Sequence, residues 1–183
     1  MDLQQTCCFT GHRPEGLSFK TDESHPDCVE LKERISQEIE RLIAEEGVRH
    51  FISGMAVGTD LIAAELVLEL KKKYPLITLE SAIPYEEQAI KWTQAQREQY
   101  YKIAGRCDES ITLQNTYTRD CMKKRNQYMV EHSGYVLAVW TGAPRSGTGQ
   151  TVRYARSLGR QITIINPKTL EIIREKQPNT AQG

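Results

Sequence analysis

The chain alternates short apolar runs with segments whose apolar residues recur at helical spacing, and this alternation limits the fold more than any other feature. The strongest run, residues 135–140 (YVLAVW), contains only apolar and aromatic residues. A continuous apolar strand is typical of the middle of a parallel sheet that helices cover on both faces. Further strand-like runs lie at residues 6–10, 48–52, 76–83, 108–113 and 161–166.

Helical segments separate these runs. The first, residues 28–46, repeats apolar residues at helical spacing, namely Leu31, Ile35, Ile39, Leu42 and Ile43. Four more are expected at residues 61–74, 86–104, 119–132 and 147–158. The six alternating strands predict an α/β, Rossmann-like parallel sheet with helices on both faces. We expect one domain over residues 1–183, with a core at 5–167 and a tail at 168–183 whose polar end is disordered.

Composition excludes several classes of protein. The 24 basic and 24 acidic residues balance, so no overall charge attracts nucleic acid or an anionic membrane. No apolar run is long enough to span a bilayer and the N-terminus lacks a signal pattern, which predicts a cytoplasmic protein. The five cysteines include no Cys-x-x-Cys pair, so we expect reduced thiols, no metal site and no resident cofactor.

Residues 53–60 (SGMAVGTD) stand between a strand-like run and a strongly apolar helical segment. A strand that ends in a glycine-bearing turn and re-enters as a helix gathers unpaired backbone N–H groups at the positive end of the helix dipole. Such a point binds phosphate or another anion. The candidate binding residues here are Ser53, Gly54, Gly58, Thr59 and Asp60.

Comparable residues follow other strands, and the carboxyl ends of parallel strands meet at one edge of a sheet. Ligands of such folds bind beyond that edge, where the strand order reverses. Two helix N-termini and several arginines at one crevice suit a ligand that carries phosphates. Besides the turn above, the candidates are Gly11, His12, Arg13, Arg125, Asn126, Gly142, Gly147 and Thr148, with Arg145 nearby.

Some of these residues have two interpretations. His12 is either an acid/base or phosphate-binding group, or a turn residue whose imidazole bonds backbone carbonyls. Asp60 is either a catalytic carboxylate or a helix cap. Tyr85 and Trp92, after the third strand, either stack on a base or pack against their own helix.

Two common nucleotide motifs are absent. The dinucleotide pattern Gly-x-Gly-x-x-Gly does not follow the first strand. Gly142 and Gly147 have the glycine spacing of a P-loop, but Thr148 stands where the lysine is required. Neither an ordinary dehydrogenase nor a P-loop NTPase is indicated.

Five motifs occur in an order that carries a resemblance to a known family. They are FTGHRP at 9–14, SGMAVGTD at 53–60, PYEEQ at 84–88 with Trp92, KRNQYM at 124–129, and Gly147-Thr148 with Thr151-Val152. Together they resemble the YpsA branch of the SLOG superfamily over nearly the whole chain, residues 7–167. The resemblance implies a Rossmann-like domain that binds a nucleotide or a nucleotide-derived ligand, such as ADP-ribose, NAD or a signalling nucleotide.

The superfamily also contains phosphoribohydrolases and DNA-processing protein A, so three functions are considered. The leading hypothesis is a sensor or sequestering module that binds the ligand. Cleavage of a nucleoside monophosphate is the alternative, although Thr151 stands where the phosphoribohydrolases carry a glutamate. Binding of single-stranded DNA is third, because the neutral charge disfavours nucleic acid. The relatives' dimers, and Met and Tyr residues on the 119–132 helix, suggest a homo-oligomer.

Overall fold

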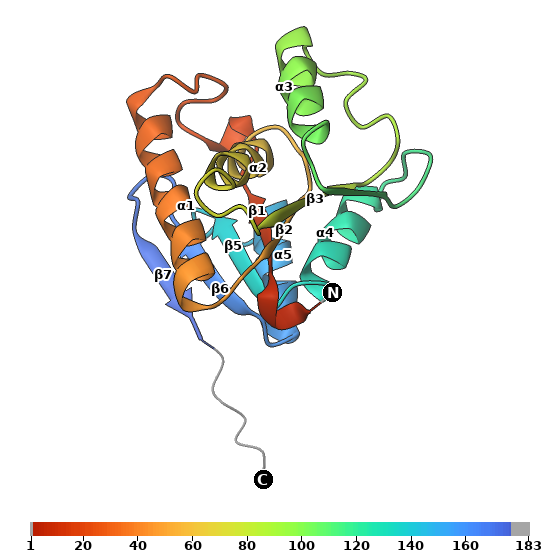
Figure 1. Ribbon diagram of the computed structural model, residues 1–183. Helices are drawn as coiled ribbons and strands as arrows, with labels where there is room; N and C mark the ends of the chain where they lie inside the picture. Colours follow the sequence, from red (N-terminus) through yellow and green to blue (C-terminus); the bar gives the residue numbers. More distant parts are fainter. Residues whose placement is uncertain (1, 177–183) are drawn as a thin grey trace.

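The protein is built on one sheet, which a computed structural model describes together with the rest of residues 2–176. Its seven strands lie in the order β4-β3-β2-β1-β5-β6-β7 (Figure 1). They are β1 (Thr6–Gly11), β2 (His50–Ser53), β3 (Thr78–Ile83), β4 (Glu109–Thr112), β5 (Tyr135–Val139), β6 (Gln161–Ile165) and β7 (Ile172–Glu175). The first six are parallel and β7 is antiparallel to β6.

Helices cover both faces of this sheet, as predicted. They are α1 (Pro26–Glu45), α2 (Thr59–Leu70), α3 (Gln94–Ala104), α4 (Cys121–Glu131) and α5 (Gly147–Ser157). One buried cluster joins the sheet to α1, α2 and α3, and a second joins it to α4 and α5. Within residues 2–176, no helix is long and apolar enough to cross a membrane.

Strand β5 has the central place that its sequence predicted. Every one of its residues is buried. Leu137 and Val139 point into the cluster with α1 and α2, whereas Val136 and Ala138 point into the cluster with α4 and α5. Because side chains alternate between the faces of a strand, an apolar run is needed only where both faces are covered. The α/β, Rossmann-like fold class is therefore confirmed.

The strand order reverses between β1 and β5. From β1 the chain builds outward through β2, β3 and β4, and it then crosses to β5 and builds the other way. The loops that leave β1 and β5 diverge to opposite faces at such a point and leave a crevice between them. This reversal of strand order is where the candidate residues are expected to meet.

The third helix is shorter than predicted. The expected helix over residues 86–104 begins only at Gln94, and turns occupy the residues before it. A capping box fixes the start: the Thr93 hydroxyl accepts from the Gln96 amide at 3.3 Å, and the Gln96 side chain accepts from the Thr93 amide at 3.1 Å. This Thr-x-x-Gln pattern marks a helix N-terminus in the sequence.

The C-terminal segment forms a strand where a tail was expected. Asn166 reverses the chain, because its side-chain oxygen accepts from the amide of Lys168 at 2.9 Å. Strand β7 then pairs with β6, with Ile172 opposite Ile165. The pair Ile172-Ile173 was too short to signal a strand by itself, and β7 is stabilised by pairing. The expected disordered end lies beyond residue 176, outside the described residues.

Helix α4 offers a different surface from the one that suggested a homodimer. Met129 is buried, and Met122 and Tyr128 are half-buried. The Tyr128 hydroxyl donates to Glu80 at 2.8 Å, so this side chain is occupied within the protein. The homo-oligomer remains a prediction.

A buried carboxylate on α1 forms hydrogen bonds that connect this helix to β7. The side chain of Glu38, only 3% exposed, accepts a hydrogen bond from Arg41 at 2.9 Å. It also accepts two from Arg174 on β7, one of them at 3.1 Å. Burial raises the pKa of Glu38, but the hydrogen bonds from Arg174 and Arg41 outweigh burial and hold the pKa below its usual value.

Replacing Glu38 by Gln is expected to lower the free energy of unfolding by about 1.5–3 kcal/mol, because charged hydrogen bonds are lost. The lowered pKa means that this contribution is present at neutral pH, above the pKa of the unfolded chain. It is lost as the pH falls through the folded-state pKa. Urea denaturation at neutral and acid pH should therefore show the difference from the wild type shrinking in acid.

The control is Glu45→Gln on the same helix. The Glu45 side chain is 68% exposed and lies 3.7 Å from Arg41. Its replacement should change the free energy of unfolding by less than about 0.5 kcal/mol. An equal loss for both variants, or a Glu38→Gln loss independent of pH, would contradict the prediction.

Candidate functional site

The loops that follow β1, β2 and β5 meet helix α4 at the point where the strand order reverses. They enclose a cavity of about 210 Å³, here called the switch-point cavity. Eight of the predicted residues line it: Gly11, His12, Arg13, Asp60, Arg125, Asn126, Gly147 and Thr148. Residues that were not predicted complete the wall, namely Thr10, Ala56, Val57, Met122 and Ser146.

A buried arginine holds the floor of this cavity. Arg125 of α4 lies 3.5 Å from the carboxylate of Asp60, at the start of α2, and donates to the Gly54 carbonyl after β2. Burial raises the pKa of Asp60, and Arg125 opposes the rise. The same carboxylate oxygen accepts from the Ala56 amide at 3.4 Å. Asp60 therefore balances the Arg125 charge and braces the turn.

Three predicted glycines allow the loops to pack closely against one another. A Cβ on Gly54 would lie 2.0 Å from the Arg125 guanidinium, and one on Gly11 would lie 2.4 Å from the Thr59 side chain. Gly58 has φ of 100°, and a Cβ there would lie 2.8 Å from the His12 carbonyl oxygen. Ser53 and Thr59 likewise lie behind the wall: Ser53 donates to the Asp60 carbonyl at 2.9 Å, and Thr59 donates to the His12 carbonyl.

His12 joins the loops on the two sides of the switch point. Its Nε2 atom accepts from the Thr141 amide at 3.0 Å and lies 3.1 Å from the Thr141 hydroxyl. Burial, together with the charge of Lys168, lowers the pKa of His12. A neutral ring with Nε2 as acceptor fits both facts. The backbone partner of His12 is thus an amide, where the turn-residue interpretation expected carbonyls, and its acid/base or phosphate-binding role remains a prediction.

The two helix N-termini expected at the crevice, those of α2 and α5, differ in whether their first amides already have hydrogen-bond acceptors. At α2 the Thr59 amide already donates to the His12 carbonyl at 3.2 Å, and Asp60 adds a negative charge. At α5 the Ser146 hydroxyl caps the Gly149 amide at 3.0 Å. The amides of Gly147 and Thr148 come first in α5 and have no carbonyl of that helix to bond. The positive end of α5 therefore faces the cavity.

Charge inside the cavity is positive. Arg13 and Arg125 bring two guanidinium groups against the single carboxylate of Asp60, and His12 is neutral. The Arg13 side chain is exposed and donates to the Met122 sulfur at 3.7 Å, a weak contact. Arg13 is thus the exposed cation of the site, whereas Arg125 is buried and paired with Asp60.

Tyr85, Trp92 and Gly142 do not line the cavity. Tyr85 packs edge-on against Tyr117 with ring centroids 5.6 Å apart, and Trp92 packs edge-on against Tyr100 at 5.5 Å. Gly142 lies in the exposed loop after β5, and Arg145 is exposed there as well. The third strand lies two strands away from the switch point, and contact of Tyr85 or Trp92 with a ligand remains a prediction.

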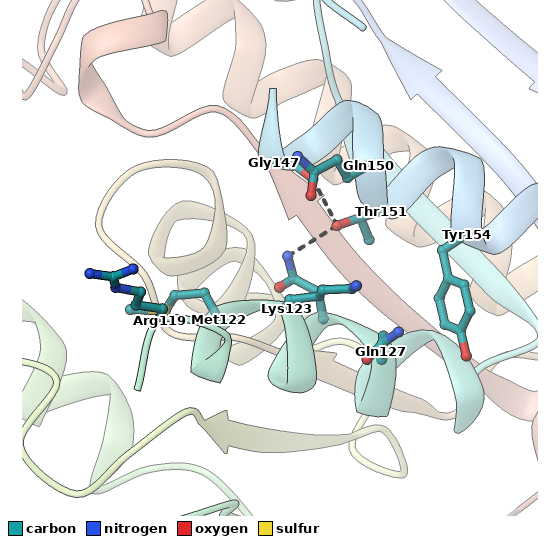
Figure 2. A pocket seen from close by; sticks show the side chains of 9 residues that line it. Arg119, Met122, Lys123, Gln127, Gly147, Gln150, Thr151 and Tyr154 are labelled. Atoms are coloured by element: carbon teal, nitrogen blue, oxygen red, sulfur yellow. Dashed lines mark hydrogen bonds between the residues drawn. The ribbon is translucent and has the colours of Figure 1, made fainter. Parts of the chain in front are cut away.

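A second cavity of about 270 Å³, here called the helix groove, opens between α4 and α5. It shares Met122, Asn126 and Gly147 with the switch-point cavity. The Asn126 side chain donates to the Thr151 hydroxyl at 3.0 Å, which donates to the Gly147 carbonyl at 3.0 Å (Figure 2). Thr151, the residue at the relatives' glutamate position, therefore braces the two helices. The other lining residues are Arg119, Lys123, Gln127, Gln150 and Tyr154.

Within residues 2–176, one group of side chains has the composition of a metal site. Ligand atoms of His50, Glu80 and Glu109 lie within 4.8 Å of one another near the amino ends of β2, β3 and β4. Hydrogen bonds already occupy the buried carboxylate: Glu80 contacts His50 at 3.0 Å and accepts from Tyr128 at 2.8 Å. This arrangement satisfies Glu80 without an ion.

Comparisons with known proteins place the chain among relatives. Residues 7–170 match the YpsA family model, described as the YspA SLOG family. The SPbeta prophage-derived protein YoqJ of Bacillus subtilis (strain 168) is 34% identical over 157 residues, which cover 78% of this chain and 91% of YoqJ.

Solved structures of DNA processing protein A share the fold. The protein from Streptococcus pneumoniae superposes with a TM-score of 0.59 at 18% identity, over 90% of this chain and 52% of that one. The protein from Helicobacter pylori, described for its single-stranded DNA binding mode, has the same TM-score and identity over 90% of this chain and 66% of that one. This chain thus spans about half to two thirds of their length.

Replacing Gly54 by Ala tests whether Arg125 is locked in place. The new methyl group would collide with the guanidinium, which its bonds to Gly54 and Asp60 prevent from moving. We expect the free energy of unfolding to fall by about 1–3 kcal/mol. The measurement is urea denaturation followed by circular dichroism.

Gly147→Ala is the matched control, because a Cβ there meets nothing within 4 Å. The change should leave the free energy of unfolding within about 1 kcal/mol of the wild type. A Gly54→Ala protein as stable as Gly147→Ala would show that Arg125 rearranges freely.

Proposed function

Since the chain belongs to the YspA SLOG family, as its motifs predicted, we propose that it binds a nucleotide or nucleotide-derived ligand, such as ADP-ribose or NAD, in the switch-point cavity. The observation that carries this proposal is the start of α5. Gly147 and Thr148, the first two residues of this helix, line a cavity that also holds Arg13 and has a net positive charge. Backbone amides at a helix N-terminus together with an arginine are suited to a phosphate group.

The remaining residues position this phosphate site. Arg125 donates to the Asn126 side-chain oxygen at 2.8 Å, and Asn126 bonds Thr151 on α5. This chain of contacts holds α4 and α5 at a fixed separation. In the proposal, Arg13 and the α5 amides bind the ligand, whereas Arg125 supplies charge and orients Asn126. The protein then acts as a sensor or a sequestering module.

Isothermal titration of the full chain with ADP-ribose, NAD and cyclic nucleotides tests the proposal. We expect at least one ligand to bind, and Arg13→Ala to weaken that binding by roughly tenfold or more, since one charged hydrogen bond is lost. Arg34→Ala, an exposed arginine on α1, is the control and should leave the affinity unchanged. Absence of binding across the panel would refute the proposal.

A second candidate function, cleavage of a nucleoside monophosphate at its N-glycosidic bond, has one observation in its favour. Asp60 is a carboxylate that lines the cavity, whereas Glu65, further along the same helix, lies 3.6 Å from Lys102 of α3 and does not line the cavity. One Asp60 oxygen is already used by Arg125 and the Ala56 amide. Thr151 offers no carboxylate in place of the relatives' glutamate.

Incubation with AMP separates binding from cleavage. The leading proposal predicts no ribose 5-phosphate above a protein-free blank. Release that disappears in Asp60→Asn, with AMP binding retained, would establish the second function instead.

Single-stranded DNA is the third candidate, since the Helicobacter pylori relative in fold is described as binding it. This chain has a formal net charge of zero, which supplies no general attraction for a polyanion. A gel shift that weakens steeply with salt would support this candidate.

A further inference from the structure

The switch-point cavity and the helix groove are compartments of one site. They share Met122, Asn126 and Gly147, so they adjoin along the start of α5. Their volumes are about 210 and 270 Å³, and each is below the roughly 300 Å³ at which ligand pockets begin. Neither compartment alone reaches the size of a ligand pocket, but the two together do.

The helix groove carries positive charge of its own. Arg119 and Lys123 line it, and no aspartate or glutamate is among its lining residues. Neighbouring Lys124 is different, because it lies 3.1 Å from Asp120 and does not line either compartment. A ligand that extends from the α5 start into the groove therefore meets a second cationic region.

The groove also contains groups that recognise a planar ring. The Tyr154 ring is half-buried, and its hydroxyl donates to Glu131 at 2.5 Å, which fixes the side chain. Gln127 and Gln150 add amide groups that donate and accept hydrogen bonds. Figure 2 shows the lining residues running along both helices, from Arg119 and Met122 at one end to Gln127 and Tyr154 at the other. Aromatic and amide groups beside cations suit a nucleoside attached to a phosphate.

We propose that the helix groove binds the second nucleoside of a dinucleotide whose phosphate linkage lies at the start of α5. This rests on the proposed function and makes it more specific: the ligand has two nucleosides joined through phosphate, rather than one. A pyrophosphate linkage and a 3′–5′ linkage share this chemistry. In both, the α5 amides and Arg13 contact the phosphate linkage. Lys123 neutralises the side of the linkage that faces the helix groove. Tyr154 and the two glutamines contact the second base.

Isothermal titration of the full chain with three ligands tests this inference. The ligands are AMP, NAD as the pyrophosphate-linked dinucleotide, and a 5′-phosphorylated 3′–5′ adenine dinucleotide. We expect one of the dinucleotides to bind at least about tenfold more tightly than AMP, and which one does so identifies the linkage. Equal affinity of AMP and both dinucleotides would overturn the inference while leaving the proposed function intact.

Variants locate the second nucleoside. Lys123→Gln and Tyr154→Leu should each weaken the preferred dinucleotide by about three- to tenfold and change AMP affinity less than about twofold. Lys124→Gln, the neighbouring lysine outside both compartments, should change neither affinity.

Thermal unfolding checks that all variants fold. Equal weakening of AMP and dinucleotide by Lys123→Gln would overturn the inference. Failure of all three ligands to bind would overturn it as well, whereas the proposed function is refuted only if ADP-ribose and the cyclic nucleotides also fail to bind.

Discussion

The guanidinium group of Arg125 lies inside the protein, where an unpaired charge would be strongly destabilising. Its pairing with Asp60, and its hydrogen bond to Gly54, connect α4 to the start of α2 and to the loop after β2. Its bond to Asn126 extends the connection toward α5. The Arg125 side chain thus holds α4 against residues 54–60, and Asn126 continues the contact to Thr151 on α5. The cavity has its shape because this contact leaves little freedom to the loops around it.

The site also contains one paired, buried arginine and one exposed arginine. Arg125 cannot turn toward a ligand without leaving Asp60 unpaired, and such a loss is costly inside a protein. Arg13 has no carboxylate partner among the described residues and makes only a weak contact to Met122. The protein thereby separates two tasks that a pair of arginines often shares. One maintains the walls, and the other is free to meet an incoming anion.

Much of this arrangement could be predicted from the sequence, because the strands, the helices and the turns between them follow from local patterns. The apolar run at β5 indicated a covered central strand, and the glycine-bearing turns indicated where loops approach one another. The sequence could not show what the glycines approach: Gly54 admits Arg125, which lies 71 residues away. Tyr85 and Trp92 were assigned to the ligand because they follow a strand. Distance from the switch point depends on strand order in space, which the linear pattern does not contain.

The edge strands add a further consequence. The family match ends at residue 170, yet the chain continues through β7, whose pairing with β6 occupies one edge of the sheet. An unpaired strand edge is a template for pairing with another chain. A protein cut where the family match ends would present bare β6 to its neighbours and would also leave Glu38 without Arg174. Strand β7 therefore covers β6 and becomes the edge strand on that side, and the sheet continues beyond the residues that match the family.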